Sequence, residues 1–394
     1  MSILKKHNIV IVGCGLVGMT LALFLAKHKI KVTIIEKNKS SKLSKINDSR
    51  TSAISQGTSR ILNEIEIWQK VEKKAQEINS IIVKEGNGNI IDFDSKSMQE
   101  GPLGFIVENK FLKKTVLKEI IKSEYVKLIS DTEALEITNE DNGPVKIKTK
   151  RGRIEANLLV GADGRYSKVR EMTEFKYYFN DYKQKAYVFN ITHTKPHKSL
   201  ALEYFFSSGP LALLPMKNNK QNISSVVWTT ESQHKFKNKG SLFNEFKKKY
   251  RDFFGTILNT TNPVEYNLNV FYCYKYFKNK VVLIGDACQA IHPIAGQGLN
   301  LGIRDSYFLA NSLKEAEDIG LEYSDSIVLE KYTQNRIIDK KLLIQSTHNL
   351  NRLFSNSSIT FSLFRKIGMR IFNKSKFLKE QSMLFAMGLK DFKL

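Results

Sequence analysis

The amino-acid sequence predicts an α/β protein with an inserted, mainly β domain and a helical C-terminal region. Three observations predict this class. A strand, a glycine-spaced turn, a helix and a second strand follow one another within residues 8–35. Strand-like runs separated by Gly, Pro and Asn dominate residues 176–272, and helical patterning prevails after Asp305. The 394 residues exceed what one simple core requires, so two domains, or one large domain with an inserted sheet, are expected.

The first element is a β-α-β unit of Rossmann type. An apolar strand at 8–12 enters a glycine-spaced turn, a helix follows to about residue 27, and a second strand at 31–35 closes with Glu36. In such a unit Gly13 makes the tight turn, Gly15 lets a pyrophosphate approach and Gly18 lets the helix pack. An acid about 20 residues past the glycines can bind an adenosine ribose, which predicts a dinucleotide site.

The segment after this unit carries a candidate cofactor contact. Arg50 lies in a polar stretch, and a guanidinium pairs bidentately with phosphate or ring acceptors, although a plain surface charge is the alternative. A helix with Leu62, Ile65 and Trp68 should follow, and 78–93 alternates like a hairpin that turns at 86–89.

Further elements are expected before residue 172. A strand at 105–108 leads into a helix at 111–122, and strands are expected near 126–129 and 145–149. The run 158–170 reads as a strand that breaks at glycine and is followed by a helix. It contains Asp163-Gly164, which resembles Gly285-Asp286 in layout, so one long ligand held at three points is expected.

The inserted β domain has four clear strand patterns, at 186–191, 200–206, 211–216 and 223–230, and one helix near 242–250. Its large aromatic residues are interpreted as core rather than as pocket lining: Phe189, Tyr204, Phe206 and Trp228.

Residues 281–305, VVLIGDACQAIHPIAGQGLNLGIRD, join a strand, a Gly-Asp turn, a loop through His292 and Pro293, a bend with Gly296 and Gly298, and a helix start. Glycines let a backbone approach a ligand, and a helix N-terminus favours negative charge. The stretch therefore predicts a helix N-terminus directed at an anionic ligand.

Composition narrows the function classes. The chain has 62 basic and 39 acidic residues and a net charge of +23, which attracts anionic partners. A general abundance of lysine is favoured over nucleic-acid binding as the explanation of this charge, because no nucleic-acid-binding motif accompanies it. Cys14, Cys273 and Cys288 form no C-x-x-C pair, which argues against a disulfide framework or a zinc site and favours a reducing compartment.

The expected location is the cytoplasm. The N-terminus lacks the layout of a cleavable signal, and no apolar run reaches about 18 residues. The basic, apolar tail 348–394 is interpreted as a helical bundle, with peripheral contact at the inner face of a membrane as the alternative.

Together these motifs resemble the FAD-dependent aromatic hydroxylases of the group A flavoprotein monooxygenases, of which para-hydroxybenzoate hydroxylase is the familiar member. The three fingerprints are the glycine turn with Glu36, residues 161–164, and residues 285–300. Within that family, HPIAGQGLNLGIRD at 292–305, GPLALLP at 209–215 and IVEN at 106–109 look like the ubiquinone-biosynthesis hydroxylase branch.

The resemblance implies a site and a division of the chain. The FAD-binding domain would comprise 1–78, 101–172 and 273–345, the substrate-binding β-sheet domain 79–100 and 173–272, and the C-terminal helical region 346–394. Glu36 would hold the adenosine ribose, Asp286 the ribityl or ribose hydroxyls, and the backbone of 298–300 would face the flavin pyrimidine edge. The implied cofactor-binding residues are Gly13, Gly15, Gly18, Glu36, Arg50, Asn109, Asp163, Gly164, Gly285, Asp286, Pro293, Gly296, Gly298, Leu299 and Asn300.

The implied reaction uses NAD(P)H as a transient reductant and O2, and hydroxylates the aromatic ring of a polyprenylated phenol through a flavin hydroperoxide. No metal and no nucleophilic side chain is assigned; His292 is a candidate for proton transfer or for a plain backbone contact. Association with other quinone-biosynthesis proteins is also implied. Alternatives are hydroxylation of a soluble aromatic acid, reduction of isoprenoid double bonds, a flavin-free subunit that organises lipid or a complex, and a basic nucleic-acid binder.

Overall fold

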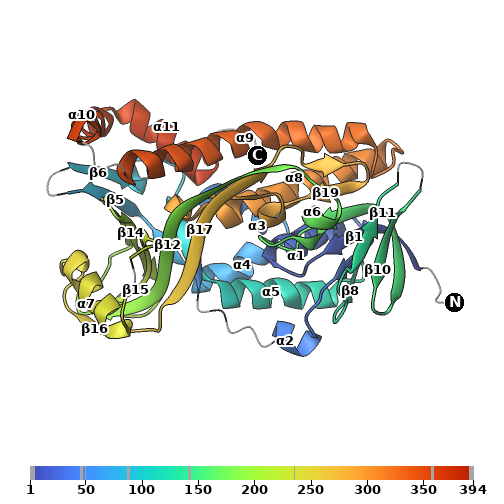
Figure 1. The fold of residues 1–394 in the computed structure, drawn as a ribbon, viewed down its shortest axis with the longest axis horizontal. Coiled ribbons are helices and arrows are strands. Elements are labelled where there is room, and N and C mark those ends of the chain that lie inside the picture. Colours follow the sequence, from blue (N-terminus) through green and yellow to red (C-terminus); the bar gives the residue numbers. More distant parts are fainter. Residues whose placement is uncertain are drawn as a thin grey trace.

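The computed structural model describes residues 5–44, 48, 50–86, 89–140, 143–234, 236–355 and 359–389. Their strands form three sheets, and the two largest occupy opposite ends of the molecule (Figure 1). The arrangement confirms the predicted α/β class with a helical C-terminal region.

The eight-stranded sheet has the order β18-β19-β11-β1-β2-β8, in which β19, β11, β1, β2 and β8 run parallel, while β10 joins β11 and β9 joins β10 in antiparallel fashion. The strands are β1 (Lys5–Val12), β2 (Val32–Ile35), β8 (Val126–Ile129), β9 (Glu136–Thr138), β10 (Val145–Thr149), β11 (Gly152–Gly161), β18 (Phe277–Lys278) and β19 (Val281–Leu283). Parallel strands buried on both faces explain the continuous Val and Ile runs.

Helix α1 (Leu16–Lys27) is the central helix of this domain. Its residues from Leu16 to Leu25 are almost all buried, because it packs against both α5 (Asn109–Lys122) and α8 (Gly298–Asp318). A helix that is apolar all round needs cover on all sides. The predicted helix at 111–122 thus begins two residues earlier, at Asn109.

A small antiparallel sheet, β3-β7-β4, lies beside α8 and the bend that precedes it. It consists of β3 (Thr51–Ser55), β7 (Gly104–Glu108) and β4 (Gln76–Ile78), with the short helices α2 (Ser40–Ser44), α3 (Gln56–Asn63), α4 (Ile67–Val71) and η1 (Glu72–Lys74) nearby in sequence. The predicted helix with Leu62 and Trp68 is therefore two helices.

The nine-stranded sheet has the order β20-β17-β12-β15-β14-β13-β5-β6, with β16 on β12. Its strands are β5 (Ser80–Glu85), β6 (Asn89–Asp94), β12 (Tyr177–His193), β13 (Leu200–Phe206), β14 (Gly209–Met216), β15 (Ile223–Glu231), β16 (Ile257–Thr260), β17 (Val264–Cys273) and β20 (Gln289–Ala290). β5 and β6 form the predicted antiparallel pair, although residues 87 and 88 of the predicted turn lie outside the described residues.

One face of this sheet is covered by α7 (Lys239–Tyr250). Phe189, Tyr204 and Trp228 are buried there, and Phe206 packs against the same cluster, which confirms their interpretation as core. The opposite face turns toward the loop that contains Ile294 and toward the C-terminal helices, as the clusters around Phe205 and Ala201 show.

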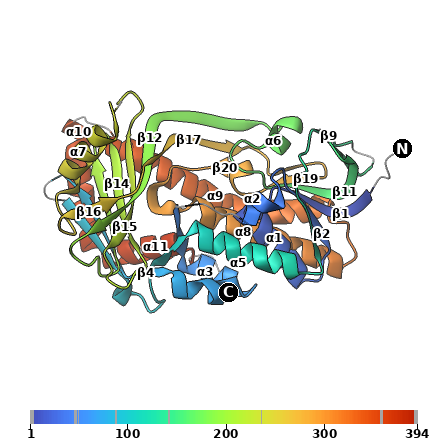
Figure 2. The same ribbon diagram turned by 90° about the horizontal axis from the view of Figure 1, so that it is seen from below.

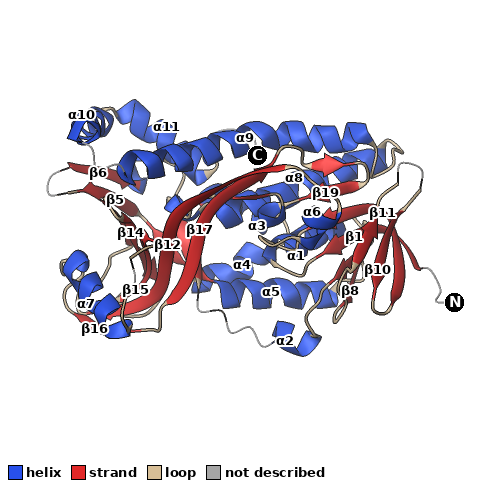
Figure 3. Ribbon diagram, viewed as in Figure 1, coloured by secondary structure: helices blue, strands red, loops and turns tan. Residues whose placement is uncertain are grey.

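Helix α9 (Ser326–Ser355) runs along one side of the molecule, from α8 at one end to β13 and β14 at the other (Figure 3). It is followed by α10 (Ile359–Lys374) and by α11 (Lys376–Met387), which returns to α3 (Figure 2). The expected domain boundary at 345/346 falls inside α9. No helix in the described part of the chain is both long and apolar enough to cross a bilayer.

Candidate functional site

The glycine turn leaves open space at one position only. A Cβ on Gly13 would lie 2.5 Å from Ala162 O, and a Cβ on Gly18 would lie 2.3 Å from Gly13 O, so both must be glycine for packing. A Cβ on Gly15 would meet no atom within 4 Å, and Gly15 is exposed at the N-terminus of α1. The turn therefore combines tight packing with room for a ligand where helix N–H groups are unpaired.

Glu36 directly follows β2, and its side chain contacts the same glycine turn. Its carboxylate accepts hydrogen bonds from Cys14 N at 2.8 Å, Asn38 N at 2.9 Å and Asn38 Nδ2 at 2.6 Å. These contacts hold the turn against β2. Since each carboxylate oxygen has two lone-pair sites, binding of a ribose hydroxyl stays a prediction compatible with them.

Asp163 has a structural role beyond the one expected. Its Oδ2 accepts hydrogen bonds from Lys168 N at 2.7 Å and Val169 N at 3.2 Å, which caps α6 (Lys168–Met172), while its buried Oδ1 has no partner among the described residues. Gly164 follows with φ of +84°. The turn thus leaves one carboxylate oxygen for a ligand.

Arg170, which sequence reasoning missed, joins the two Asp/Gly turns. It donates to Ala287 O at 2.8 Å and to Arg165 O at 3.0 Å, and it lies 4.5 Å from the ring centroid of Phe271. An arginine at the end of a short helix carries no spacing signal, so only the fold identifies its role.

Asp286 faces open space inside the molecule. Its side chain is exposed, yet desolvation raises its pKa, against the opposing effect of Arg165 and Arg50. Both observations hold when a carboxylate borders a recess enclosed by protein rather than the outer surface. This geometry fits the predicted binding of a sugar-chain hydroxyl.

A buried charge cluster fixes the Gly285 turn from behind. Asp305 Oδ2 accepts from Gly285 N at 3.0 Å and lies 3.0 Å from Lys340 Nζ, while its Oδ1 accepts from Arg336 Nε at 2.8 Å. Burial alone would raise the pKa of Asp305, but Lys340 and Arg336 outweigh it and hold the pKa below its usual range. Arg336 also contacts Asp339 at 2.6 Å, so α9 supports the turn.

The loop after β20 contains His292, which is fully buried. Its Nδ1 accepts a hydrogen bond from Ile294 N at 3.4 Å, so we assign the proton to Nε2, which lies 3.3 Å from Gln184 Oε1. Burial lowers the pKa of His292 to about 3. A neutral histidine with both nitrogens engaged is a structural element here, not a base near neutral pH.

The bend before α8 leaves open space beside its backbone at Gly298. Pro293 precedes the short helix η4 (Ile294–Gly296), and Gly296, with φ of +61°, would place a Cβ 2.9 Å from Ala53 Cβ. A Cβ on Gly298 would meet nothing within 4 Å. Leu301 N donates to Gln297 O at 3.0 Å, so the three preceding N–H groups have no intrahelical acceptor.

Asn300 uses its side chain for structure. It is fully buried, accepts from Ser55 N at 3.0 Å and donates to Ala53 O at 2.9 Å. These bonds tie α8 to β3 and leave the backbone N–H groups of Gly298, Leu299 and Asn300 for a ligand.

Arg50 and Asn109, both predicted to lie along the cofactor, contact each other. Asn109 N donates to Arg50 O at 2.9 Å, and Asn109 Oδ1 accepts from Ser52 Oγ at 2.6 Å. The Arg50 guanidinium is held by both oxygens of Asp48, at 2.8 and 2.7 Å, so it is oriented before any ligand binds. Tyr266 on β17 also contacts Arg50, which brings the large sheet to this point.

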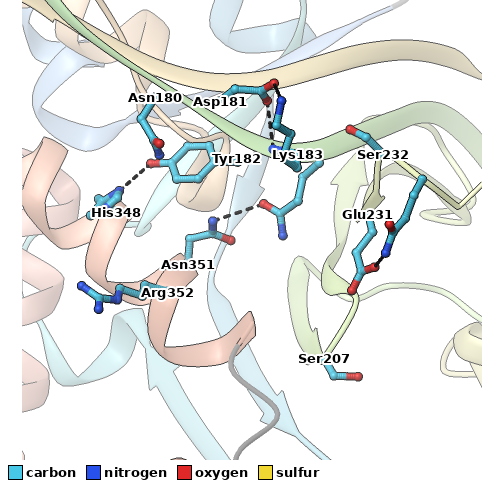
Figure 4. Close-up of a pocket in the computed structure, with 12 residues that line it drawn as sticks. Asn180, Asp181, Tyr182, Lys183, Ser207, Glu231, Ser232, His348, Asn351 and Arg352 are labelled. Carbon is cyan, nitrogen blue, oxygen red and sulfur yellow. Dashed lines mark hydrogen bonds and ion pairs between the residues drawn. The ribbon is translucent and has the colours of Figure 1, made fainter.

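A polar pocket of about 710 Å³ opens between the irregular part of β12 and the end of α9 (Figure 4). Tyr182 Oη lies 3.1 Å from His348 Nδ1, and Asn351 Nδ2 donates to Gln184 Oε1 at 3.2 Å. The pocket contains none of the predicted cofactor residues, and it touches their loop only through Gln184, the partner of His292. The cofactor site predicted at the glycine turn, the two Asp/Gly turns and the α8 N-terminus lies elsewhere and stays a prediction.

Known proteins are similar to this chain in sequence and in fold. A family model described as FAD binding domain matches residues 6–345. The chain is 32% identical over 389 residues to ubiquinone hydroxylase UbiL of Rhodospirillum rubrum, covering 98% of this chain and 90% of that protein. It is 27% identical to 3-demethoxyubiquinol 3-hydroxylase of Escherichia coli, covering 98% of this chain and 99% of that protein. The crystal structure of p-nitrophenol 4-monooxygenase PnpA from Pseudomonas putida has a similar fold, with a TM-score of 0.82, 16% identity, and coverage of 99% of this chain and 100% of that chain.

Proposed function

The chain belongs to the FAD binding domain family and is an FAD-dependent monooxygenase, and we propose that it hydroxylates the aromatic ring of a polyprenylated phenol in ubiquinone biosynthesis. The observation that carries this proposal is similarity along nearly the whole length of both chains to proteins named as ubiquinone hydroxylases. NAD(P)H is the proposed transient reductant.

The residues of the site fit FAD. The open positions at Gly15 and Gly298 leave space where the pyrophosphate and the flavin would approach the backbone, and Asp286 faces the recess between them. We propose that Glu36 holds the ribose, and that Arg50 and Asn109 lie along the cofactor. When bound, FAD would accept a hydride from NAD(P)H and activate oxygen for transfer to the ring.

The protein's part in this chemistry is positioning and electrostatics. The N–H groups of Gly298, Leu299 and Asn300, together with the dipole of α8, would stabilise negative charge on a bound flavin ring. Arg165 and Arg50 add positive potential near Asp286. The neutral, buried His292 fills the loop without adding a charge, which helps to keep water from the reacting atoms.

Deleting the gene and measuring quinone intermediates by mass spectrometry tests the function. We expect a prenylated precursor that lacks one ring hydroxyl to accumulate, and its mass and fragmentation will identify the ring position. Unchanged quinone levels would contradict the proposal.

Purified protein distinguishes the alternatives. A yellow protein with a flavin spectrum excludes the flavin-free subunit. Oxidation of NAD(P)H coupled to product from soluble phenols, with none from prenylated phenols, would favour hydroxylation of a soluble aromatic acid.

Contact with a membrane surface is proposed for the C-terminal helices. Four apolar side chains on α10 and α11 are exposed, and basic residues lie between them, which is the pattern of an amphipathic surface for anionic lipid. This C-terminal surface comprises Ile367, Arg370, Ile371, Lys374, Lys376, Phe377 and Leu378. A substrate with a polyprenyl chain would be met at such a surface.

A further inference from the structure

One carboxyl group on the large sheet has no role in the site described so far. Glu203 lies in the middle of β13, where Leu202 and Tyr204 point into the α7 cluster. Alternation therefore directs Glu203 to the opposite face, with its neighbours Ala201 and Phe205. That face is directed toward the loop that contains Ile294.

The surroundings of Glu203 connect it to the cofactor site. Phe205, two residues on, packs in one cluster with Ile294 of the loop before Gly296, and stacks on Phe354 of α9 with 3.9 Å between ring centroids. Ala201, two residues before, packs with Ile106 of β7 and with two methionines of α11. Glu203 thus lies between the apolar cluster that contains Ile294 and a second apolar cluster around Ala201.

Glu203 forms no hydrogen bond or ion pair within the described residues. Its immediate cross-strand neighbours are Val83 and Ala212, both apolar. Its side chain is half-buried, yet burial raises its pKa to about 7, and no charged group contributes to that rise. Partial exposure combined with desolvation indicates a recess bordered by protein rather than the outer surface.

Charged groups on the neighbouring elements do not neutralise it. These elements carry Glu85 on β5, Asp92 on β6, which pairs with Lys379 at 3.2 Å, and Arg352 on α9. None of them contributes to the raised pKa of Glu203. The carboxyl therefore has no hydrogen-bond partner in the part of the chain that the structure describes.

Two hydroxyl groups on the same face are also without partners. The register pairs Glu203 with Ala212, and Ala212 with Val227, so Ser225 and Thr229 on β15 face the same side as Glu203. Both are buried, and neither hydroxyl oxygen has a hydrogen-bond partner among the described residues. Unsatisfied polar groups on an otherwise apolar face point to a ligand with a polar head.

We propose that Glu203 binds the phenolic hydroxyl of the substrate and accepts its proton, with the prenyl chain in the apolar cluster around Ala201. This proposal rests on the proposed hydroxylation of a prenylated phenol. In the step, the O–H bond of the phenol breaks, a new O–H bond forms on the Glu203 carboxylate, and the electron pair stays on the phenolate oxygen. The ring of the phenolate is richer in electrons than that of the phenol, so it is a better nucleophile toward the transferred oxygen. Glu203 returns its proton to water before the next turnover.

The environment suits this role. A phenol has a pKa of about 10, and an ordinary carboxylate is too weak a base for it. A carboxyl in an apolar recess is a stronger base, so the proton transfer is less uphill. Above neutral pH Glu203 is anionic and ready to accept, whereas below it the group is already protonated.

The test uses the FAD-loaded protein, with 2-geranylphenol as the probe and its methyl ether as the analogue without the hydroxyl. Product formation is followed across the pH range around neutrality, and binding of both compounds is followed by the change in flavin absorbance. For Glu203→Gln we expect FAD content to be unchanged and kcat/KM to fall by about 100-fold. The rising limb of the wild-type pH profile should disappear, and the preference for the phenol over the ether should be lost.

Glu231→Gln is the matched control, because Glu231 is an exposed carboxylate at the end of β15 in the same sheet; it should behave as wild type. If Glu203→Gln does not fold, Glu203→Asp provides the test, and its pH limb should shift while the preference for the phenol persists. Wild-type kcat/KM, pH limb and phenol preference in Glu203→Gln would overturn this inference alone. A wild-type protein that hydroxylates soluble phenols and not 2-geranylphenol would overturn the proposed function and this inference with it.

Discussion

Gly298 begins α8 at a point where an added Cβ would meet no protein atom within 4 Å. A leucine would therefore fit the protein but occupy the space that we assign to the flavin. We expect Gly298→Leu to fold normally and to bind FAD at least about tenfold more weakly, a loss of about 1.4 kcal/mol. Fluorescence titration of the flavin measures the affinity, and circular dichroism checks the fold.

The matched control for that substitution is Gly368→Leu. Gly368 is also a helical glycine with nothing within 4 Å of an added Cβ, but it lies on α10, away from the cofactor site. Its FAD affinity should equal that of the wild type. A Gly298→Leu protein with full flavin content and turnover would refute the assignment of this position.

His292 makes stability depend on pH. Its folded pKa is about 3, whereas an unfolded histidine has a pKa of about 6.5, so below that value the unfolded chain binds more protons. The folded state should therefore lose stability as the pH falls from 6.5 toward 3, by up to about 1.4 kcal/mol per pH unit from this group. In His292→Gln this contribution should vanish, as urea unfolding at several pH values will show.

The exposed His234 gives the comparison for that series. His234→Gln should keep the wild-type dependence on pH. Identical slopes in the His292→Gln protein and the wild type would show that the buried ring is not the group responsible.

Sequence predicted the residues whose role depends on local spacing. Gly18 is required by its contact with Gly13 inside the β-α-β unit, and Gly13 has a φ of +111° in the turn itself, so the local motif identifies both. Arg170 and Glu203 escaped prediction because their roles depend on Ala287 and on Ile294, far along the chain. Asn300 lay in a predicted motif, but the use of its side chain to join α8 to β3 follows only from the packing.

At the scale of elements, the contact between α8 and α9 supports the turn at Gly285. Asp305 on α8 compensates Arg336 and Lys340 on α9, and all three side chains are nearly completely buried. Asp305→Asn leaves these cations without their counter-charge, which costs about 3–5 kcal/mol in comparable buried pairs. We expect a fall of that size in the free energy of unfolding of the FAD-free protein, measured with urea.

An exposed pair is the appropriate reference for this loss. Glu136 and Lys148 lie 3.0 Å apart with both side chains more than half exposed, so Glu136→Gln should cost at most about 1 kcal/mol. If Asp305→Asn costs no more than Glu136→Gln, the buried cluster does not stabilise the α8–α9 contact.

The elements that sequence predicted least well belong to the long antiparallel ribbon. β12 spans Tyr177–His193, whereas the pattern indicated only 186–191. Its register against β17 shifts between Asp181 and Gln184, and three large residues near its start are exposed, so the alternation of apolar and polar residues is broken. Single-chain patterns detect strands with one buried face, and this ribbon has none at that end.

At the scale of the whole molecule, the charge of +23 and the C-terminal surface predict association with anionic lipid. We expect the protein to sediment with vesicles that contain anionic lipid, and to do so less with neutral vesicles or at high salt. The pair Ile371→Glu and Phe377→Glu, both exposed on the C-terminal surface, should reduce binding by about tenfold or more while FAD content stays unchanged.

Ile121 provides the matched control, since it is 71% exposed on α5 and is not part of the C-terminal surface. Ile121→Glu should leave vesicle binding unchanged. Equal loss in both variants would mean that added negative charge, and not the C-terminal surface, decides the association.

The order of the sheets also exceeded what sequence patterns reveal. The pattern predicted a hairpin at 78–93, but not that β5 would lie parallel to β13 and so extend a sheet built from residues more than 100 positions later. Such pairing depends on long-range packing rather than on local alternation. By contrast, the class of the fold followed from the β-α-β unit and from the strand-like or helical patterning of each segment, which are local properties.

The support of Gly285 by Lys340 has a consequence for how the protein is made. The predicted cofactor site begins at Gly13, but its turn at Gly285 is braced, through Asp305, by Lys340, more than 300 residues later. Synthesis proceeds from the N-terminus, at about 5–20 residues per second. A ribosome-bound chain that stops short of α9 therefore has its glycine turn before the second turn is braced, so we expect FAD to bind only after α9 has been made.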